Sequence, residues 1–159
     1  MKPFYCVLLF LLITTGSYGQ NFSDHFLDKT LRVDYIFTGD VKQQSIVLDE
    51  LSELPTWAGR RHHLSELPLE GNGQITIKDL STKQCIYKTS FSSLFQEWLS
   101  TYEAKETTKG FENSFLLPYP KQPVEVEIIL LNPRKEVMTS FKHIVRPDDI
   151  LIHKRGTSH

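Results

Sequence analysis

The sequence predicts a mostly β protein, a β-sandwich of the immunoglobulin-like or jelly-roll type with one short helix and one long ordered loop. Three observations predict this class. Apolar and polar residues alternate with a period of two in several segments, and turn-forming residues separate those segments. One further stretch places its apolar residues at helical spacing. The 159 residues suit one domain, and 40% hydrophobic residues are enough for a packed core.

The alternating segments are the predicted strands. The first, 31–38, has apolar side chains at every second position and ends at Gly39-Asp40. The last two form the best-defined hairpin, because Pro133 in the intervening turn presets the backbone for a type I turn. In chain order the predicted strands are 31–38, 44–48, 75–78, 85–91, 124–130 and 137–145.

The predicted helix follows residue 93. Ser93 and Gln96 fit a capping box, and Lys109-Gly110 marks the far boundary. Helical spacing favours core positions for the apolar face, although its aromatic rings also offer a sugar-stacking platform. That face consists of Leu94, Phe95, Trp98, Leu99 and Tyr102. The segment 49–72 is rich in proline and glycine and is expected to be the long ordered loop.

Residues 1–19 are predicted to be a cleavable signal peptide. A positive start precedes an apolar run over 4–13, and small residues precede an expected cut between Gly19 and Gln20. The apolar run is shorter than the roughly 20 residues of a spanning helix, which disfavours an uncleaved anchor. The sequence therefore predicts a secreted or periplasmic domain over 20–159, with no membrane span after cleavage.

Charge and cysteine content narrow the class further. The sequence has 18 Lys and Arg against 19 Asp and Glu. This near balance gives no electrostatic support for binding to nucleic acid or to an anionic membrane. Cys6 lies in the leader, which leaves Cys85 alone. We therefore expect no internal disulfide and a buried structural thiol at Cys85, because no histidine beside it in sequence would favour the thiolate.

No catalytic or metal-binding motif is present. His63 has Glu66 three residues later, but Leu67 occupies the position where an inverted zinc motif needs histidine, and Pro68 interrupts any helix. The sequence contains no nucleophile elbow and no phosphate-binding glycine loop. Acidic residues occur in pairs, which we expect on the solvated surface rather than in a cleft. The pairs are Asp49-Glu50, Glu103 with Glu106, and Asp148-Asp149.

One loop combines several chemistry-bearing residues. Trp57, Arg60, Arg61, His62 and His63 place an indole, two guanidiniums and two imidazoles within seven positions. Such a loop can recognise carboxylates or stack on aromatic rings. The alternative is a structural loop whose arginines bind acids and backbone carbonyls of the same domain. The composition favours the structural interpretation over recognition of a ligand.

Several stretches, in order along the chain, resemble the N-terminal domain of the bacterial immunoglobulin-A peptidase family, secreted zinc metallopeptidases. The resemblance extends from about Phe22 to about Gly156. The stretches that carry it are Thr30–Gly39, Trp57–Leu64, Gly71–Ile75, Tyr87–Leu99 and Glu103–Asn113.

The resemblance implies an accessory rather than a catalytic domain. In such proteins the zinc ligands belong to a separate peptidase domain that follows, so no cofactor and no site residue transfers to this sequence. The partner would be a family peptidase domain or its protein substrate. A stand-alone binding module for a host glycoprotein or glycan is the second hypothesis. Three origins fit the end at His159: a truncated gene, a natural stand-alone domain, or a piece excised from a longer protein, of which the leader and the chain end favour the first two.

Overall fold

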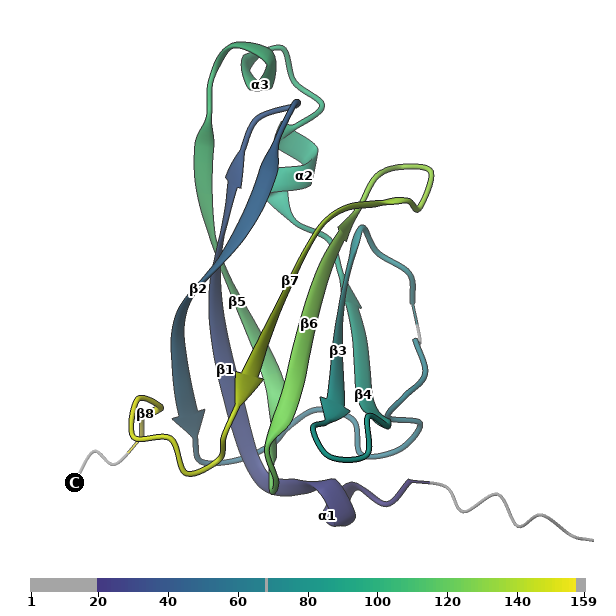
Figure 1. The fold of residues 1–159 in the computed structure, drawn as a ribbon, viewed down its shortest axis with the longest axis vertical. Helices are drawn as coiled ribbons and strands as arrows, with labels where there is room; N and C mark the ends of the chain where they lie inside the picture. Colours follow the sequence, from purple (N-terminus) through teal and green to yellow (C-terminus); the bar gives the residue numbers. More distant parts are fainter. Residues whose placement is uncertain (1–19, 68, 157–159) are drawn as a thin grey trace, which may run out of the picture.

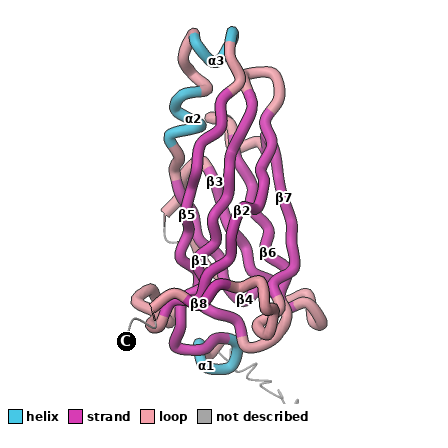
Figure 2. The backbone as a smooth tube through the Cα atoms, turned by 90° about the vertical axis from the view of Figure 1, so that its left-hand side faces the viewer, coloured by secondary structure: helices cyan, strands magenta, loops and turns pink. Residues whose placement is uncertain are grey.

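The computed structural model describes residues 20–67 and 69–156, and its fold is a sandwich of two four-stranded sheets with only short helices (Figure 1). Figure 2 shows helices α2 and α3 at one end of the sandwich, and α1 and strand β8 at the other. The predicted mostly β sandwich is confirmed. The predicted signal peptide lies outside the described residues and stays a prediction.

The first sheet is built around β1, and its strand order is β5-β1-β2-β8. Strand β1 pairs antiparallel with both β2 and β5, and its alternate side chains from Leu31 to Phe37 are fully buried. The short β8 pairs parallel with β2. The bounds are β1 Phe26–Gly39, β2 Gln44–Leu54, β5 Lys109–Pro120 and β8 His153–Lys154.

Strand β2 is longer than the predicted 44–48, so residues 49–54 are wrongly assigned to the loop. Tyr35 pairs with Leu48 whereas Asp34 pairs with Glu50, which leaves Asp49 without a partner. This extra residue is a β-bulge. Before it the inward-facing positions have even numbers, as at Ile46 and Leu48, and after it they have odd numbers, as at Leu51, so the alternation in the sequence is broken. The loop therefore begins at Pro55.

Strand β5 has no counterpart in the sequence prediction. Its aromatic residues Phe111, Phe115 and Tyr119 lie on one face of a strand, but Pro118 and Pro120 discourage a strand assignment because proline cannot donate to the ladder. The structure places β5 at the edge of its sheet, where the missing donors can be tolerated.

The second sheet consists of two hairpins with the strand order β4-β3-β6-β7, and both predicted hairpins are confirmed. The turn between β6 and β7 is closed by a 2.9 Å hydrogen bond from the Lys135 amide to the Asn132 carbonyl, with Pro133 at its second position. The bounds are β3 Gly73–Asp79, β4 Cys85–Phe91, β6 Val124–Leu131 and β7 Val137–Val145.

The core lies between the sheets and is rich in aromatic rings. Phe91 of β4 contacts Phe115 of β5 with ring centroids 4.5 Å apart, and it stacks on Phe37 of β1 at 6.1 Å. These contacts join the two sheets, so burial of apolar surface stabilises the sandwich without a disulfide among the described residues. Cys85 is half-buried rather than buried as predicted.

The helices are shorter than predicted and their faces differ. Phe95 and Trp98 are buried as expected, but Leu94 and Tyr102 are 70% and 74% exposed. Tyr102 therefore does not share a sugar-stacking platform with them. Helix α2 ends at Trp98. The Ser100 hydroxyl donates to the Glu97 carbonyl and the Thr101 hydroxyl to the Trp98 carbonyl, so side chains bind the carbonyls at the end of the helix. The helices are α1 Phe22–His25, α2 Leu94–Trp98 and α3 Glu103–Glu106, and none in the described part of the chain could span a membrane.

The capping box at α2 forms only in part. Ser93 Oγ accepts a hydrogen bond from the Gln96 backbone amide at 3.3 Å, as predicted. The Gln96 side chain does not return to the Ser93 amide. Its Nε2 donates instead to the carbonyls of Asn72 at 2.5 Å and Leu131 at 2.9 Å. Gln96 thereby fixes the helix to the ends of the second sheet.

Replacing Ser93 should weaken this attachment. We expect Ser93→Ala to lower the free energy of unfolding by about 1 kcal/mol. The Gln96 backbone amide would lose its acceptor, and the contact between the Ser93 hydroxyl and the Gln96 side chain would also be lost. Urea denaturation measures the change. Ser92→Ala is the matched control, since Ser92 is the exposed neighbour. Equal stability of the two variants would contradict the capping role.

Candidate functional site

The loop that follows β2 carries the predicted site residues, and its core is Trp57. The indole is 5% exposed and packs edge-on against Tyr87 of β4, and its Nε1 donates to the Arg60 carbonyl at 3.0 Å. Gly59 lies against the indole so closely that an added Cβ would stand 2.1 Å from a ring atom. Only glycine fits there, so the loop is shaped around the buried tryptophan.

Arg60 fixes the loop to the free edge of β4. Its guanidinium donates to the carbonyls of His63 at 2.6 Å and Leu64 at 3.1 Å, and also to the Lys88 carbonyl of β4. It lies 5.2 Å from the centroid of the Tyr87 ring. The Lys88 amide in turn donates to the Leu64 carbonyl at 2.8 Å. The loop thus covers an edge strand that would otherwise present unpaired backbone groups.

Arg61 points to the N-terminal side of the domain. Its Nη2 lies 2.5 Å from Asp28 Oδ1 and 3.1 Å from the Trp57 carbonyl, and its guanidinium lies over the Phe22 ring. The ion pair is exposed on both sides, with 41% and 63% of the two side chains accessible. The hydrogen bond from Arg61 lowers the pKa of Asp28 below its usual value.

The two histidines point to solvent. His62 and His63 are exposed, and His63 Nδ1 lies 3.2 Å from Glu66 Oε1. Together with Arg60 they line a shallow hollow of about 350 Å³. The described residues contain no group of three or more side chains placed to hold a metal ion. The structure thus separates the five predicted residues into a buried anchor, two internally bonded arginines and two accessible imidazoles.

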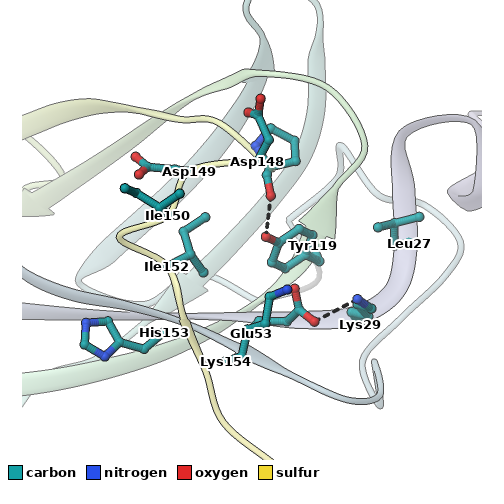
Figure 3. Close-up of a pocket in the computed structure, with 11 residues that line it drawn as sticks. Leu27, Lys29, Glu53, Tyr119, Asp148, Asp149, Ile150, Ile152, His153 and Lys154 are labelled. Atoms are coloured by element: carbon teal, nitrogen blue, oxygen red, sulfur yellow. Dashed lines mark hydrogen bonds and ion pairs between the residues drawn. The ribbon is translucent and has the colours of Figure 1, made fainter.

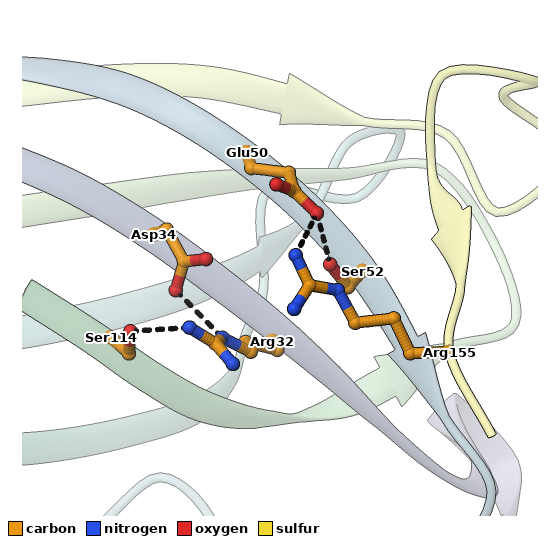
Figure 4. A network of polar contacts seen from close by, with 6 residues as sticks. All are labelled: Arg32, Asp34, Glu50, Ser52, Ser114 and Arg155. Carbon is orange, nitrogen blue, oxygen red and sulfur yellow. Dashed lines mark hydrogen bonds and ion pairs between the residues drawn. The ribbon is translucent and has the colours of Figure 1, made fainter.

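Two of the three acidic pairs place a carboxylate in contacts within the domain, whereas Asp148 and Asp149 line a hollow beside β8 rather than an open surface. Figure 4 shows Glu50 on the outer face of the first sheet, where it accepts from Ser52 at 2.8 Å and pairs with Arg155 at 2.5 Å. The hydrogen bond from Arg155, with a smaller effect of the one from Ser52, lowers the pKa of Glu50 below its usual value. Glu103 accepts from Trp98 Nε1 at 2.9 Å and pairs with Lys109. Both carboxylates serve internal contacts.

A second ionic group on the same face connects β1 with β5. Arg32 pairs with Asp34 at 2.9 Å and donates to Ser114 Oγ at 3.0 Å (Figure 4). The hydrogen bond to Asp34 raises the pKa of Arg32. The ion pair lies within β1, and the hydrogen bond to Ser114 joins β1 to β5, so the guanidinium is engaged in contacts within the sheet.

Two larger hollows were not predicted. One of about 660 Å³ lies beside β8, and Figure 3 shows Tyr119, Glu53 and Ile152 around it. Tyr119 donates to the Pro147 carbonyl at 2.8 Å, and burial, with a smaller effect of Glu53, raises the pKa of Tyr119 to about 12. Ile150 and Ile152 of the apolar run 150–152 contribute to its lining.

The other hollow, of about 430 Å³, lies beside α2. Leu99, Leu131 and Met138 supply its apolar lining. Several of its side-chain amides are already bonded: Gln44 donates to the Asp40 carbonyl, and Asn132 accepts from two backbone amides and donates to Glu136. The hollow therefore offers a ligand an apolar recess together with the side chain of Asn72.

Fold and surface together define a β-sandwich domain with internally bonded polar groups and no metal-ligand cluster among its described residues. The chain belongs to the peptidase M64 family, which is the IgA peptidase family: the family model described as Peptidase M64 N-terminus matches residues 21–142. The predicted resemblance is confirmed. No curated protein matches the sequence. No catalytic domain is identified in this sequence.

Proposed function

We propose that this domain is a non-catalytic accessory domain of a secreted zinc metallopeptidase, and that it supports or presents the catalytic domain. The observation that carries the proposal is the match of residues 21–142 to the N-terminal region of the peptidase family. The described residues do not fit a zinc site, so the zinc would be held by the catalytic domain. Export by the predicted leader is part of the proposal.

The loop over residues 57–64 has a structural role in this proposal. Its arginines donate to carbonyls of the same domain, and its tryptophan is buried, which supports a structural interpretation over recognition of a ligand. The alternative is a stand-alone binding module for a host glycoprotein or glycan. The exposed pair His62 and His63, beside a hollow of about 350 Å³, favours that alternative.

Linked thermal denaturation tests the accessory role. We expect the melting temperature of an M64 catalytic domain to rise when this chain is added in excess, because binding to the native state stabilises it. At a concentration of 100 times Kd the gain is about 2.7 kcal/mol. The chain alone, supplied with zinc, should leave casein intact. Chelator-sensitive cleavage by the pure chain, or an unchanged melting temperature alongside saturable glycan binding, would overturn the proposal.

A further inference from the structure

The segment 146–155 is held firmly at both ends although much of it is exposed. At its start the Pro147 carbonyl accepts from Tyr119 of β5. At its end β8 pairs with β2, the Arg155 backbone amide donates a hydrogen bond to the Glu53 carbonyl at 2.9 Å, and the Arg155 guanidinium pairs with Glu50. Ile152 is 6% exposed and packs into the core. The segment is therefore part of the domain rather than a loose tail.

The turn in this segment presents two aliphatic side chains to solvent. Ile150 is 95% exposed and Leu151 is 72% exposed. The turn is closed by Asp149, whose side chain accepts from the Leu151 amide at 2.9 Å and whose carbonyl accepts from the Ile152 amide at 3.1 Å. A hydrogen-bonded turn fixes the two side chains outward, because they cannot fold back without breaking these bonds.

The surroundings resemble a protein interface in composition. Ile150 lies at the margin of the 660 Å³ hollow, and Figure 3 shows the ion pair of Lys29 and Glu53 and the side chain of Lys154 around the same hollow. Asp148 and Asp149 stand on the turn itself. An apolar centre with a rim of both charges is the usual anatomy of a contact between proteins.

We infer that this turn, Ile150 and Leu151 with the adjoining hollow, is the surface on which a peptidase catalytic domain docks; the inference rests on the proposed function. The family model of the N-terminal region ends at residue 142, inside β7, so this turn lies just beyond the matched residues, on the side of the chain that leads toward the rest of such a protein. A glycan is disfavoured because the turn offers aliphatic side chains, and Tyr119 in the adjoining hollow is only 2% exposed. A second copy is disfavoured because a two-fold contact would bring the carboxylates of Asp148 and Asp149 from both copies together.

Sedimentation velocity with paired variants tests the surface. Ile150→Ser combined with Leu151→Ser should raise the Kd for an M64 catalytic domain about tenfold or more, since loss of two buried apolar anchors exceeds 1.4 kcal/mol. Val47→Ser combined with Leu116→Ser is the matched control, because these two side chains are 49% and 57% exposed on the outer face of the first sheet.

The outcomes separate the surface from the proposed function. If the unmodified chain binds and only the turn variant loses affinity, the docking surface is supported. If the unmodified chain binds and the turn variant keeps its Kd, the surface is wrong while the accessory role stands. If the unmodified chain does not bind, the proposed function and the surface both fail. Circular dichroism melting of each variant establishes that it is folded, as expected for substitutions at exposed positions.

Discussion

Arg60→Ala is expected to lower the free energy of unfolding by about 3 kcal/mol, because hydrogen bonds from a charged donor contribute about 1.5–3 kcal/mol each and do not add fully. The guanidinium of Arg60 reaches three backbone carbonyls, one of them on β4, and covers Tyr87. Removing it takes one donor from each carbonyl, although those of His63 and Leu64 keep the backbone amides of Glu66 and Lys88. It also uncovers the edge of the second sheet. Urea denaturation with an unchanged m value would record the loss.

Arg61→Ala is the matched control for Arg60. Its partner Asp28 is exposed, so the ion pair is screened by solvent and the loss should be clearly smaller. Arg60→Lys should recover only part of the stability, because one ammonium group cannot span the three acceptors of the guanidinium. If Arg61→Ala costs as much as Arg60→Ala, or if neither changes stability, the structural role of the loop is wrong.

Acidification should destabilise the domain by about 2 kcal/mol between pH 7 and pH 4.5, through the half-buried His143. His143 of β7 faces the core, where its Nε2 and the hydroxyl of fully buried Tyr35 share a 2.6 Å hydrogen bond. Its Nδ1 is buried and has no partner among the described residues. Burial lowers the pKa of His143 to about 4 and raises that of Tyr35 above its usual value.

The direction of the effect follows from proton uptake. The unfolded chain titrates near the ordinary histidine value of 6.5, whereas the folded domain keeps His143 neutral down to about 4. Between these values the unfolded state binds more protons, so stability falls as the pH falls. The full contribution is present above about pH 6.5. Carboxyl groups whose pKa values are lowered in the folded domain reduce its stability only at lower pH. Asp79, with a pKa of about 2, is an example.

Urea denaturation at a series of pH values isolates the histidine. His143→Phe should remove the slope between pH 6.5 and pH 4.5, even though its stability at pH 7 is reduced by the unpaired Tyr35 hydroxyl. Tyr35→Phe should keep the slope because it retains the half-buried imidazole. A slope of the same size in the native sequence and in His143→Phe would show that other groups control the acid sensitivity.

The fold was predictable where the local pattern and the tertiary role agree. The hairpin over 124–145 combines strict alternation with a proline turn, and the structure reproduces it. The second half of β2 could not be recognised, because the bulge at Asp49 shifts the buried face by one residue. Strand β5 was hidden by its two prolines, which are tolerated only because the strand lies at an edge.

The candidate sites were less predictable than the fold. The composition of the loop identified Arg60 and Trp57, but the carbonyl of Lys88 that Arg60 reaches comes from another strand 28 residues away. His143 carried no sequence signal, since its depressed pKa arises from packing between the two sheets. The apolar run 150–152 was visible in the sequence, yet only the structure shows that Ile152 is buried while Ile150 and Leu151 are exposed.

Isothermal titration calorimetry at several temperatures tests the accessory role most directly. The chain would be titrated into a purified M64 catalytic domain, with a glycan series as the parallel ligand. The proposal predicts saturable 1:1 binding to the catalytic domain with a negative heat-capacity change, because docking buries apolar surface. Absence of any binding heat at every temperature, together with saturable glycan binding, would contradict the accessory role and establish the stand-alone binding module in its place.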